Sequence, residues 1–551
     1  MDASFGTIWE AVAARLPGAI AISEPWRDYS YAEFENRSAR LAAALEAGGV
    51  GPGAKVACYL YNGAAYLETV FAALKLGAVP VNANYRYTAA ELTALLADAD
   101  AAAVVFSGEL GANVTHAAEH LPTLRVLVRV GPAPTPVPTN RIAEFEEVLA
   151  RHSPRAVTPR PGTDQIFMYT GGTTGKPKGV IWQQRDLLHS LVVPIFRPAG
   201  AADLPATLAE VVALAASARA SGRAPTVMPV VPLMHATGLF NSMGALLVGG
   251  RVVTARPGGL DARDVWETVA AQEASTIIVA GNAVCQPLVD ELLAVERAGR
   301  RHDLGPLRSV ISSGTALSDR LKHALHARAE VTIIDAIASS EGGPFAFAIT
   351  SSVDDLPARF FPVPATKVLA EGDRDVVPGG GEAGVLAYSG PMPLGYYKDQ
   401  ERTARTFRIV DGVRYSIPGD LARVEADGAI RFLGRGSGVI NTGGEKVHPQ
   451  EVEDALLTHP DVLDTAVVGV PDEIWGERVG AVVATASDKL SANELQEWVR
   501  RRLAGYKVPR SIVRVRELPR TPTGKLELAW ARRVIQESPA HTDDDTSTRR
   551  R

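Results

Sequence analysis

Residues 169–180 read YTGGTTGKPKGV, a run of glycines and threonines followed by two lysines. Glycines let a backbone fold closely around an anion, hydroxyl and amide groups donate hydrogen bonds to its oxygens, and lysines neutralise its charge. The apolar residues 165–169 predict a strand, so the pattern indicates a strand followed by a polyphosphate-binding loop. It is not a Walker A loop, because Thr170 stands where the first glycine would be and Pro177 replaces the magnesium-binding Ser or Thr. A flexible turn without a ligand is the alternative.

The rest of the chain alternates short apolar runs with helical patterns. A strand-like run at residues 55–61 precedes residues 64–76, where apolar residues recur at helical spacing. Such alternation is typical of βαβ units and mostly parallel sheets, so we expect an α/β fold. Further strands are predicted at residues 78–81, 102–106, 276–279, 308–312 and 331–334, and an alanine-rich helical segment at residues 199–223.

Composition narrows the class of protein. The 551 residues are 46% hydrophobic and 22% charged with a formal net charge of −5, which fits a globular protein and argues against a dedicated nucleic-acid binder. Two cysteines, Cys58 and Cys285, form neither a disulfide framework nor a zinc motif, which favours a reducing compartment. We find no signal-peptide pattern at the start, and the apolar residues 64–81 contain Glu68 and Lys75, so we expect a cytoplasmic protein that does not bind membranes.

The sequence resembles the adenylate-forming superfamily of acyl-CoA synthetases, luciferases and peptide-synthetase adenylation domains. The resemblance rests on the loop at residues 169–180 and on seven further motifs that follow the order of that superfamily along the chain. The matching motifs are LGAVPVNAN (76–84), PLMHATG (232–238), SSGTAL (312–317), DAIASSEG (335–342), YSIPGDL (415–421), GRGSGVINTGGEKV (434–447) and LPRTPTGKL (518–526).

The resemblance implies a two-domain organisation. The N-terminal AMP-binding domain would span residues 1–436, with two αβ-layered subdomains and a small β-barrel-like subdomain at about 376–436. A small mobile α+β C-terminal domain would span residues 437–537, and residues 538–551 would form a disordered tail. Ser437 would be the hinge.

The resemblance also implies ATP, Mg²⁺ and coenzyme A as cofactors. Thr170, Thr173, Thr174 and Lys178 would hold the β- and γ-phosphates, Ser340 would donate to the α-phosphate, and Asp420 would accept from the ribose hydroxyls near Arg435. Glu341 would bind Mg²⁺, and Lys525 would bridge the α-phosphate and the substrate carboxylate. The remaining cofactor-binding residues implied are Gly171, Gly172, Gly175, Gly314, Thr315, Ala316, Asp335, Ala336, Ile337, Phe432, Gly443 and Lys446.

In the family, a carboxylate first attacks the α-phosphate of ATP, and coenzyme A then attacks the acyl-adenylate. Gly443 and Gly444 in the loop NTGGEK (441–446) would leave room for the pantetheine arm, so Gly444 joins Lys525 and Glu341 as a catalytic position. The acid would lie against His235, Gly238, Ala280, Gly314, Ala338 and Gly342.

These small residues favour a bulky, hydrophobic acid, terpenoid or polyketide-like and typical of natural-product biosynthesis. The segments SSE and NTGGEKV are similar to those of the branch that acts on steroid and terpenoid acids. A long-chain fatty acid is the runner-up.

Departures from the family pattern cluster around adenine. Ile337 replaces the stacking aromatic and Ala338 replaces a glycine. One alternative is therefore a chain weak in adenylation that mainly converts a preformed acyl-adenylate to a thioester. Transfer to a carrier protein in trans, a partner ligase, a homodimer and a nucleotide-binding regulatory pseudoenzyme are further alternatives, although a pseudoenzyme has no need to retain Lys178, Glu341, Asp420, Arg435 and Lys525 together.

Overall fold

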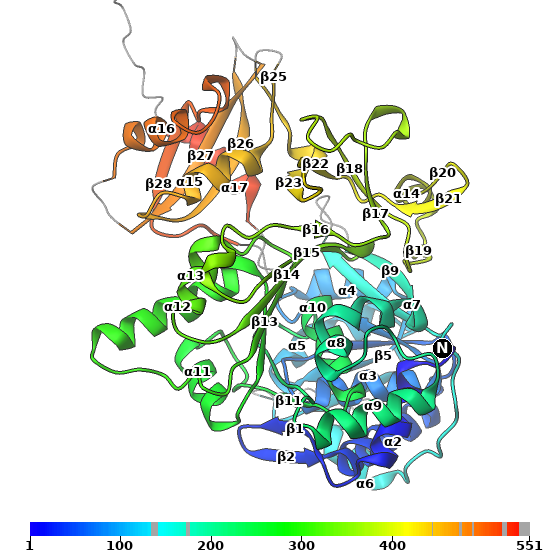
Figure 1. Cartoon of the computed structure of the whole chain (residues 1–551). Coiled ribbons are helices and arrows are strands. Elements are labelled where there is room, and N and C mark those ends of the chain that lie inside the picture. The colour runs from blue at the N-terminus through cyan, green and yellow to red at the C-terminus, as the bar shows by residue number, and fades with distance from the viewer. Residues whose placement is uncertain are drawn as a thin grey trace, which may run out of the picture. The chain divides into compact units, whose positions relative to one another are not determined.

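Two mostly parallel sheets form the larger of two units, which comprises residues 1–367 and 387–418 (Figure 1). The computed structural model describes residues 1–133, 142–171, 177–442, 445–472, 476–486, 490–520 and 526–538. The expected α/β fold is confirmed. The domain boundary expected after residue 436 stays a prediction, as does the tail, of which all but Ser538 lies outside the described residues.

The first sheet combines parallel central strands with antiparallel edges. Its strand order is β16 (Phe361–Pro362), β15 (Gly342–Thr350), β14 (Thr332–Ser339), β13 (Ser309–Ser313), β12 (Thr276–Val279), β10 (Thr226–Pro229), β11 (Arg251–Val253), β1 (Ile20–Glu24) and β2 (Arg27–Ser30). The pairs from β14 to β1 are parallel, whereas β15, β16 and β2 join antiparallel.

The second sheet has the order β19 (Gly395–Tyr396), β9 (Pro177–Gln183), β8 (Gln165–Gly171), β4 (Val79–Asn82), β3 (Lys55–Tyr59), β5 (Ala101–Ser107), β6 (Val126–Val130) and β7 (Ile142–Glu144). Only the pairs of β9 with β8 and β19 are antiparallel. The strands predicted from the sequence fall within one to two residues of these bounds, except that β14 continues to Ser339 because it pairs antiparallel with β15.

Helices cover both sheets of this unit. They are α1 (Phe5–Arg15), α2 (Tyr31–Ala47), α3 (Ala64–Leu76), α4 (Ala89–Asp98), α5 (Gly111–His120), α6 (Phe145–Arg151), α7 (Gln184–Leu188), α8 (Arg197–Ala199), α9 (Leu208–Ala220), α10 (Ala236–Leu247), α11 (Ala262–Ala271), α12 (Gly281–Arg297), α13 (Asp319–His326) and α14 (Gln400–Thr406). The predicted helix at 64–76 is confirmed, and within residues 199–223 the helix α9 begins at a capping box of Thr207 and Glu210. A hairpin of β20 (Phe407–Val410) and β21 (Val413–Ser416) completes the unit.

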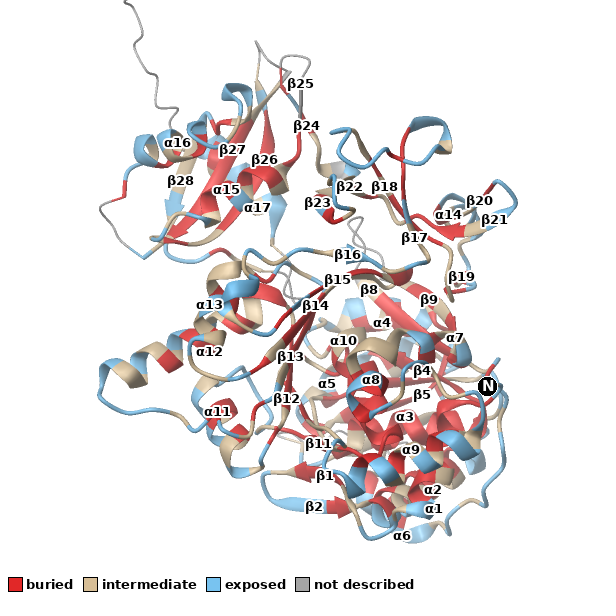
Figure 2. Ribbon diagram, in the orientation of Figure 1, coloured by how far each residue is buried: buried red, intermediate tan, exposed pale blue. Residues whose placement is uncertain are grey.

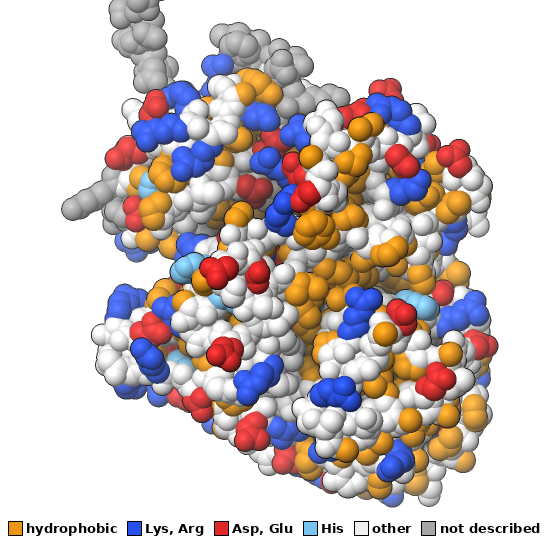
Figure 3. Space-filling view, in the orientation of Figure 1, with side chains coloured by type: hydrophobic (Ala, Val, Ile, Leu, Met, Phe, Trp, Pro, Cys, Tyr) orange, Lys and Arg blue, Asp and Glu red, His pale blue; other side chains and the backbone are white. Residues whose placement is uncertain are grey.

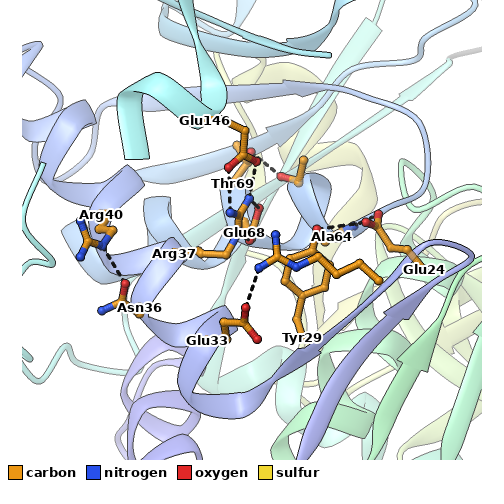
Figure 4. Close-up of polar contacts among 12 residues, drawn as sticks. Glu24, Tyr29, Glu33, Asn36, Arg37, Arg40, Ala64, Glu68, Thr69 and Glu146 are labelled. Carbon is orange, nitrogen blue, oxygen red and sulfur yellow. Dashed lines mark hydrogen bonds and ion pairs between the residues drawn. The ribbon is translucent and has the colours of Figure 1, made fainter. Parts of the chain in front are cut away.

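Helix α3 is buried on nearly all sides, including its charged residues Glu68 and Lys75 (Figure 2). Burial of a charge is costly unless the charge is paired. Arg37 of α2 pairs with Glu68 and also with Glu146, at 2.7 Å (Figure 4). Lys75 pairs with Glu10 at 2.6 Å and with Glu35. Ion pairs therefore fasten α3 to the helices around it.

Aromatic side chains supply the apolar part of the same core. The Trp9 ring lies with its centroid 5.0 Å from Tyr31, 5.0 Å from Phe34 and 5.1 Å from Phe71. Full burial of such rings stabilises a fold by about 1.5–3 kcal/mol each. On the face shown in Figure 3, Lys and Arg side chains are interspersed with Asp and Glu.

The smaller unit comprises residues 368–386 and 419–551. In it, residues 383–385 of β18 (Ala383–Tyr388) pair with β22 (Asp420–Val424), and β22 pairs with β23 (Ile430–Arg435). A further sheet contains β24 (Ile440–Thr442), β25 (Glu445–Val447), β26 (Val462–Asp472), β27 (Gly476–Thr485) and β28 (Ser511–Val515), with helices α15 (Pro449–Leu457), α16 (Ala492–Arg500) and α17 (Leu528–Glu537). In the part of the chain that the structure describes, no helix is long and apolar enough to cross a bilayer.

Candidate functional site

The strands β8 and β9, on either side of the glycine- and threonine-rich segment, pair antiparallel. Thr170 and Lys178 are register partners at the end of this hairpin, so their side chains project from the same face. Both are half-buried. Gly172, Thr173, Thr174 and Gly175 lie outside the described residues, and of Gly171 only the backbone is described. The hairpin thus presents one hydroxyl and one ammonium group beside its tip.

Packing explains one glycine of this motif. Gly179 is the register partner of Tyr169, and a Cβ atom on Gly179 would lie 2.8 Å from two carbons of the Tyr169 ring. The Tyr169 hydroxyl donates to Asp98 Oδ2 at 2.7 Å. Burial, together with this hydrogen bond, raises the pKa of Tyr169 far above its usual value. Tyr169 therefore stays a neutral donor that fastens the hairpin to α4.

A single buried amide joins the phosphate hairpin to the segment before α10. Asn82, at the end of β4, donates from Nδ2 to the Tyr169 carbonyl at 2.9 Å and to the Met234 carbonyl at 2.8 Å. Its Oδ1 accepts from the Tyr169 N–H at 2.7 Å. Three hydrogen bonds from one side chain thus fix the start of the hairpin relative to His235, which follows Met234.

A second amide holds the same segment from the neighbouring strand. Asn62, three residues beyond β3, donates to the carbonyls of Pro229 at 3.1 Å and Val231 at 3.3 Å, and accepts from the Leu233 N–H at 2.7 Å. Residues 229–234 are therefore held by two asparagines whose strands are parallel neighbours. His235 then forms the N-cap of α10 and is half-buried.

Glu341 lies in the turn between β14 and β15 and is 9% exposed. The Tyr396 hydroxyl donates to Glu341 Oε1 at 2.8 Å, and the Ser416 hydroxyl donates to the Glu341 carbonyl at 2.6 Å. The Trp182 indole N–H donates to the neighbouring Ser340 carbonyl at 3.0 Å. Three side chains thus hold this turn.

The sheet register places these contacts on the side of β9 that carries Lys178. Residues 178, 180 and 182 alternate to one face, and Tyr396 is the register partner of Val180. Lys178, Trp182 and Tyr396 therefore share a face, and the last two contact residues 340 and 341. The structure brings the predicted phosphate-binding lysine and the predicted magnesium-binding carboxylate to the same side of the same strand.

Hydrogen bonds join the loop after β12 to the loop after β13, which carries the predicted cofactor-binding residues 314–316. The Thr315 hydroxyl donates to the Ala280 carbonyl at 3.0 Å, and the Asn282 N–H donates to the Ala316 carbonyl at 2.8 Å. Gly281 has a φ of +55°, and a Cβ atom there would lie 2.3 Å from Thr315 Oγ1. Gly314 has a φ of +93° and open space where a Cβ atom would be. The structure thus joins Ala280 to residues 314–316.

The Asp335 carboxylate is directed to an ion pair with Lys322 Nζ at 2.8 Å, and both residues are buried. Burial raises the pKa of Asp335, and Lys322 opposes the shift. A contact of Asp335 with a nucleotide stays a prediction. Ala336, Ile337 and Ala338 are half-buried on the same strand, and the Ser313 hydroxyl donates to the Ala336 carbonyl at 3.1 Å.

Two glycines of the predicted acid pocket are explained by close packing. A Cβ atom on Gly238 would lie 2.9 Å from the Pro232 carbonyl oxygen, and one on Gly342 would lie 2.8 Å from the Ser416 hydroxyl. Their small size is needed for the packing of α10 and of the Glu341 turn. Gly314, by contrast, is exposed, and a Cβ atom there would contact no neighbouring residue.

In the smaller unit, Asp420 begins β22 and is the register partner of Arg435 at the end of β23. Asp420 is buried and Phe432 is half-buried. The side chains of Arg435, Ser437 and Lys446 are not described, and Gly443, Gly444 and Lys525 lie outside the described residues. Their predicted roles, including the hinge, stay predictions.

Among the described residues of the turn, Glu341 supplies a carboxylate for a hard cation. Mg²⁺ is bound through one or two carboxylates together with phosphate oxygens of a substrate, and prefers oxygen ligands. With Tyr396 on Oε1, the carboxylate is fixed in one orientation. The Glu341 carboxylate therefore fits Mg²⁺ as a ligand.

Sequence reasoning missed five residues that build this site: Asn62, Asn82, Trp182, Tyr396 and Ser416. Asn82 and Ser416 lie inside the motifs LGAVPVNAN (76–84) and YSIPGDL (415–421), but their roles were not assigned. A polar amide at the end of an apolar strand was the available signal for Asn82.

Known proteins match this chain over nearly its whole length. Residues 9–397 match the family described as AMP-binding enzyme, and residues 451–525 match its C-terminal domain. The chain is 36% identical to the 3-oxocholest-4-en-26-oate–CoA ligase of Rhodococcus rhodochrous, over 94% of this chain and 93% of the relative. It is also 36% identical to the medium/long-chain-fatty-acid–CoA/3-oxocholest-4-en-26-oate–CoA ligase of Mycolicibacterium smegmatis, over 95% of each chain.

The fold is similar to that of a benzoate CoA ligase from Burkholderia xenovorans LB400. The TM-score is 0.77 at 24% identity, and the match covers 96% of this chain and 99% of that one.

Proposed function

The chain belongs to the AMP-binding enzyme family and is an AMP-forming acyl-CoA ligase, and from this premise we propose that it activates a bulky, hydrophobic carboxylic acid of the steroid or terpenoid kind. Its substrates are the acid, ATP and coenzyme A. The observation that carries the proposed mechanism is the shared face of Lys178 and the Glu341 turn, which gives ATP one lysine and one oriented carboxylate at a common edge.

In the first half-reaction, an oxygen of the substrate carboxylate attacks the α-phosphorus, the bond to the β-phosphate oxygen breaks, and pyrophosphate leaves. Phosphoryl transfer needs positioning and charge neutralisation more than covalent help. Thr170 donates to the phosphates and Lys178 neutralises them. Glu341 would hold Mg²⁺, which supplies charge neutralisation when bound. We propose that Lys525 stabilises the negative charge as it moves from the substrate carboxylate to the α-phosphate.

In the second half-reaction, the thiolate of coenzyme A attacks the acyl carbon and AMP leaves. Asp420 would hold the ribose of the departing nucleotide through both hydroxyls. Gly443 and Gly444 would let the pantetheine arm pass close to the backbone. Rotation about Ser437 between the half-reactions belongs to the same proposal.

The names of two relatives support a bulky acid. Two relatives that match over more than nine-tenths of the chain are named for 3-oxocholest-4-en-26-oate, a steroid acid with a side-chain carboxylate. The second of these names also includes medium and long-chain fatty acids, so a long-chain fatty acid is the second candidate substrate.

Pyrophosphate exchange with a panel of acids tests the proposal. We expect a steroid acid with a side-chain carboxylate to stimulate exchange at least tenfold more than palmitate, and amino acids to give none. Higher exchange with palmitate would make the fatty acid the substrate. Absence of exchange with every acid, together with thioester formation from a supplied acyl-adenylate, would instead favour the alternative of impaired adenylation.

Two lysine variants separate the proposed catalytic role from a general loss of charge. Lys525→Ala should abolish exchange. Lys398→Ala is the matched control, because Lys398 is exposed and pairs with Asp100 at 2.8 Å, and it should exchange as the parent does. Unchanged exchange in Lys525→Ala would refute the assignment of that lysine. Offering coenzyme A and a carrier protein as acceptors distinguishes the two thiols.

A further inference from the structure

Helix α5 carries three side chains that can bind metal on its last turn. They are His116, Glu119 and His120, all exposed, and one ligand atom from each lies within 4.8 Å of the other two. Residues at positions i, i+3 and i+4 of a helix project from one face. The other face of α5 is buried through Val114 and Ala117.

The two imidazoles are already oriented toward one another. Their ring centroids are 4.5 Å apart with an angle of 39° between the planes. His120 Nδ1 lies 2.8 Å from the His116 carbonyl oxygen. Because a carbonyl oxygen only accepts hydrogen bonds, Nδ1 carries the proton in this contact, and the neutral ring offers Nε2 as an electron-pair donor. Metal-binding histidines usually have such a second hydrogen bond, which fixes the tautomer and the ring orientation.

The anchoring of α5 keeps this turn in place. Asn113, one turn earlier, donates from Nδ2 to the Tyr59 hydroxyl and to the Tyr87 carbonyl, both at 3.0 Å. In the described part of the chain, no side-chain hydrogen bond or ion pair engages the Glu119 carboxylate, so it can turn toward the rings. The cluster also lies at the C-terminal end of α5, where the helix dipole favours a cation.

We propose that His116, Glu119 and His120 form a binding site for a divalent transition-metal ion, with Zn²⁺ as its preferred occupant. Zinc takes imidazole nitrogens and carboxylate oxygens at about 2.0–2.2 Å, so its tetrahedral ligands are about 3.3 Å apart. With His120 held by the His116 carbonyl, rotation of the exposed His116 and Glu119 side chains would close the present spacing to that value. Two nitrogen ligands select against Mg²⁺, which prefers oxygen. Three protein ligands leave the fourth position for water or an exogenous group.

This site is separate from the proposed use of Mg²⁺ at Glu341 and does not rest on the proposed ligase chemistry. Its ligands come from one helical turn, so it needs no change in the rest of the fold. The proposal concerns binding of the ion and can be measured without any substrate.

Calorimetric titration of the full-length, tag-free protein with ZnCl₂, after dialysis against a chelator, tests the site. We expect one saturable event whose affinity falls at least tenfold in His116→Ala and in His120→Ala, and less in Glu119→Gln. Substitution by Co²⁺ should give visible absorption bands that the double histidine variant lacks. Wild-type affinity in Glu119→Gln would overturn the three-ligand site.

A histidine elsewhere provides the matched control. His323 is exposed on α13, four residues before the C-cap Ala327, and His323→Ala should bind Zn²⁺ as the parent does. Equal melting temperatures of all variants in chelator establish that the fold is intact. Parent-like Zn²⁺ affinity in the double histidine variant, or equal loss in His323→Ala, would overturn the proposal.

Discussion

Replacement of Asn82 with alanine should weaken the use of ATP and of the acid together. The change removes the bonds to both Tyr169 backbone groups and to the Met234 carbonyl, at 2.7–2.9 Å. Each hydrogen bond is worth about 1 kcal/mol net, and more where a buried partner is left unsatisfied, so we expect a loss of about 3 kcal/mol in the free energy of unfolding. If about 1.4 kcal/mol of this appears in ATP binding, the KM for ATP rises about tenfold.

Asn62→Ala provides a matched comparison. It also removes three hydrogen bonds, but all of them lie in residues 229–233 and none touches the phosphate hairpin. Both variants should lose similar stability and raise the KM for the acid, whereas only Asn82→Ala should raise the KM for ATP.

Pyrophosphate exchange at varied ATP and varied acid, with urea unfolding of both variants, measures these quantities. Equal rises in the KM for ATP in both variants would show that a general loosening is responsible. An unchanged KM for ATP in Asn82→Ala would refute the coupling through Asn82.

Tyr396→Phe removes the hydroxyl that donates to Glu341 Oε1, a hydrogen bond to a charged group worth about 1.5–3 kcal/mol. Pyrophosphate exchange should therefore fall about tenfold or more, and the variant should need more Mg²⁺ for half-maximal exchange. A Mg²⁺ titration like that of the parent would contradict this. Burial raises the pKa of Glu451, but the hydrogen bond and charge of Lys507 outweigh it and leave that pKa below its usual value. The ionised Glu451 therefore stabilises the fold above about pH 4.5 and less as the pH falls. In urea unfolding from pH 3.5 to 7, the free energy of unfolding of Glu451→Gln should decrease less at low pH than that of the parent. An unchanged decrease would exclude this contribution. Burial raises the pKa of Glu68 to about 7. The folded state then holds this proton more tightly than the unfolded state, so the free energy of unfolding falls by on the order of 1–3 kcal/mol as the pH rises from about 4.5 to 7. Melting curves of Glu68→Gln over this pH range should not show that decrease. A decrease like that of the parent would assign it to other groups.

The sequence predicted the strands of the larger unit because most are short apolar runs between turn signals. The run at 276–279 coincides with β12. The end of β14 could not be predicted, since residues 335–339 (DAIAS) have a mixed pattern and are strand only because β15 pairs beside them. A strand made of an apolar run can be predicted from its local sequence. A strand that forms because a neighbouring strand pairs with it can be recognised only in the fold.

The candidate site divides in the same way. Thr170, Lys178 and Glu341 could be named from the sequence because their chemistry and order match a family motif. Asn62, Asn82 and Tyr396 could not be assigned roles, because their hydrogen bonds join residues 55 to 171 positions apart. The histidines of α5 were missed although the spacing of His116, Glu119 and His120 can be read from the sequence, because residues 111–120 were not assigned to a helix.

The two asparagines have a consequence for protein engineering. Through Asn62 and Asn82, the carboxyl ends of β3 and β4 in one sheet hold the chain as it leaves β10 in the other. A chimera that exchanges the acid-binding half of this unit for that of a relative would cut through these contacts unless both amides travel with residues 229–234. Grafts that respect this junction should keep the stability of the parent, and those that divide it should unfold at lower urea concentrations.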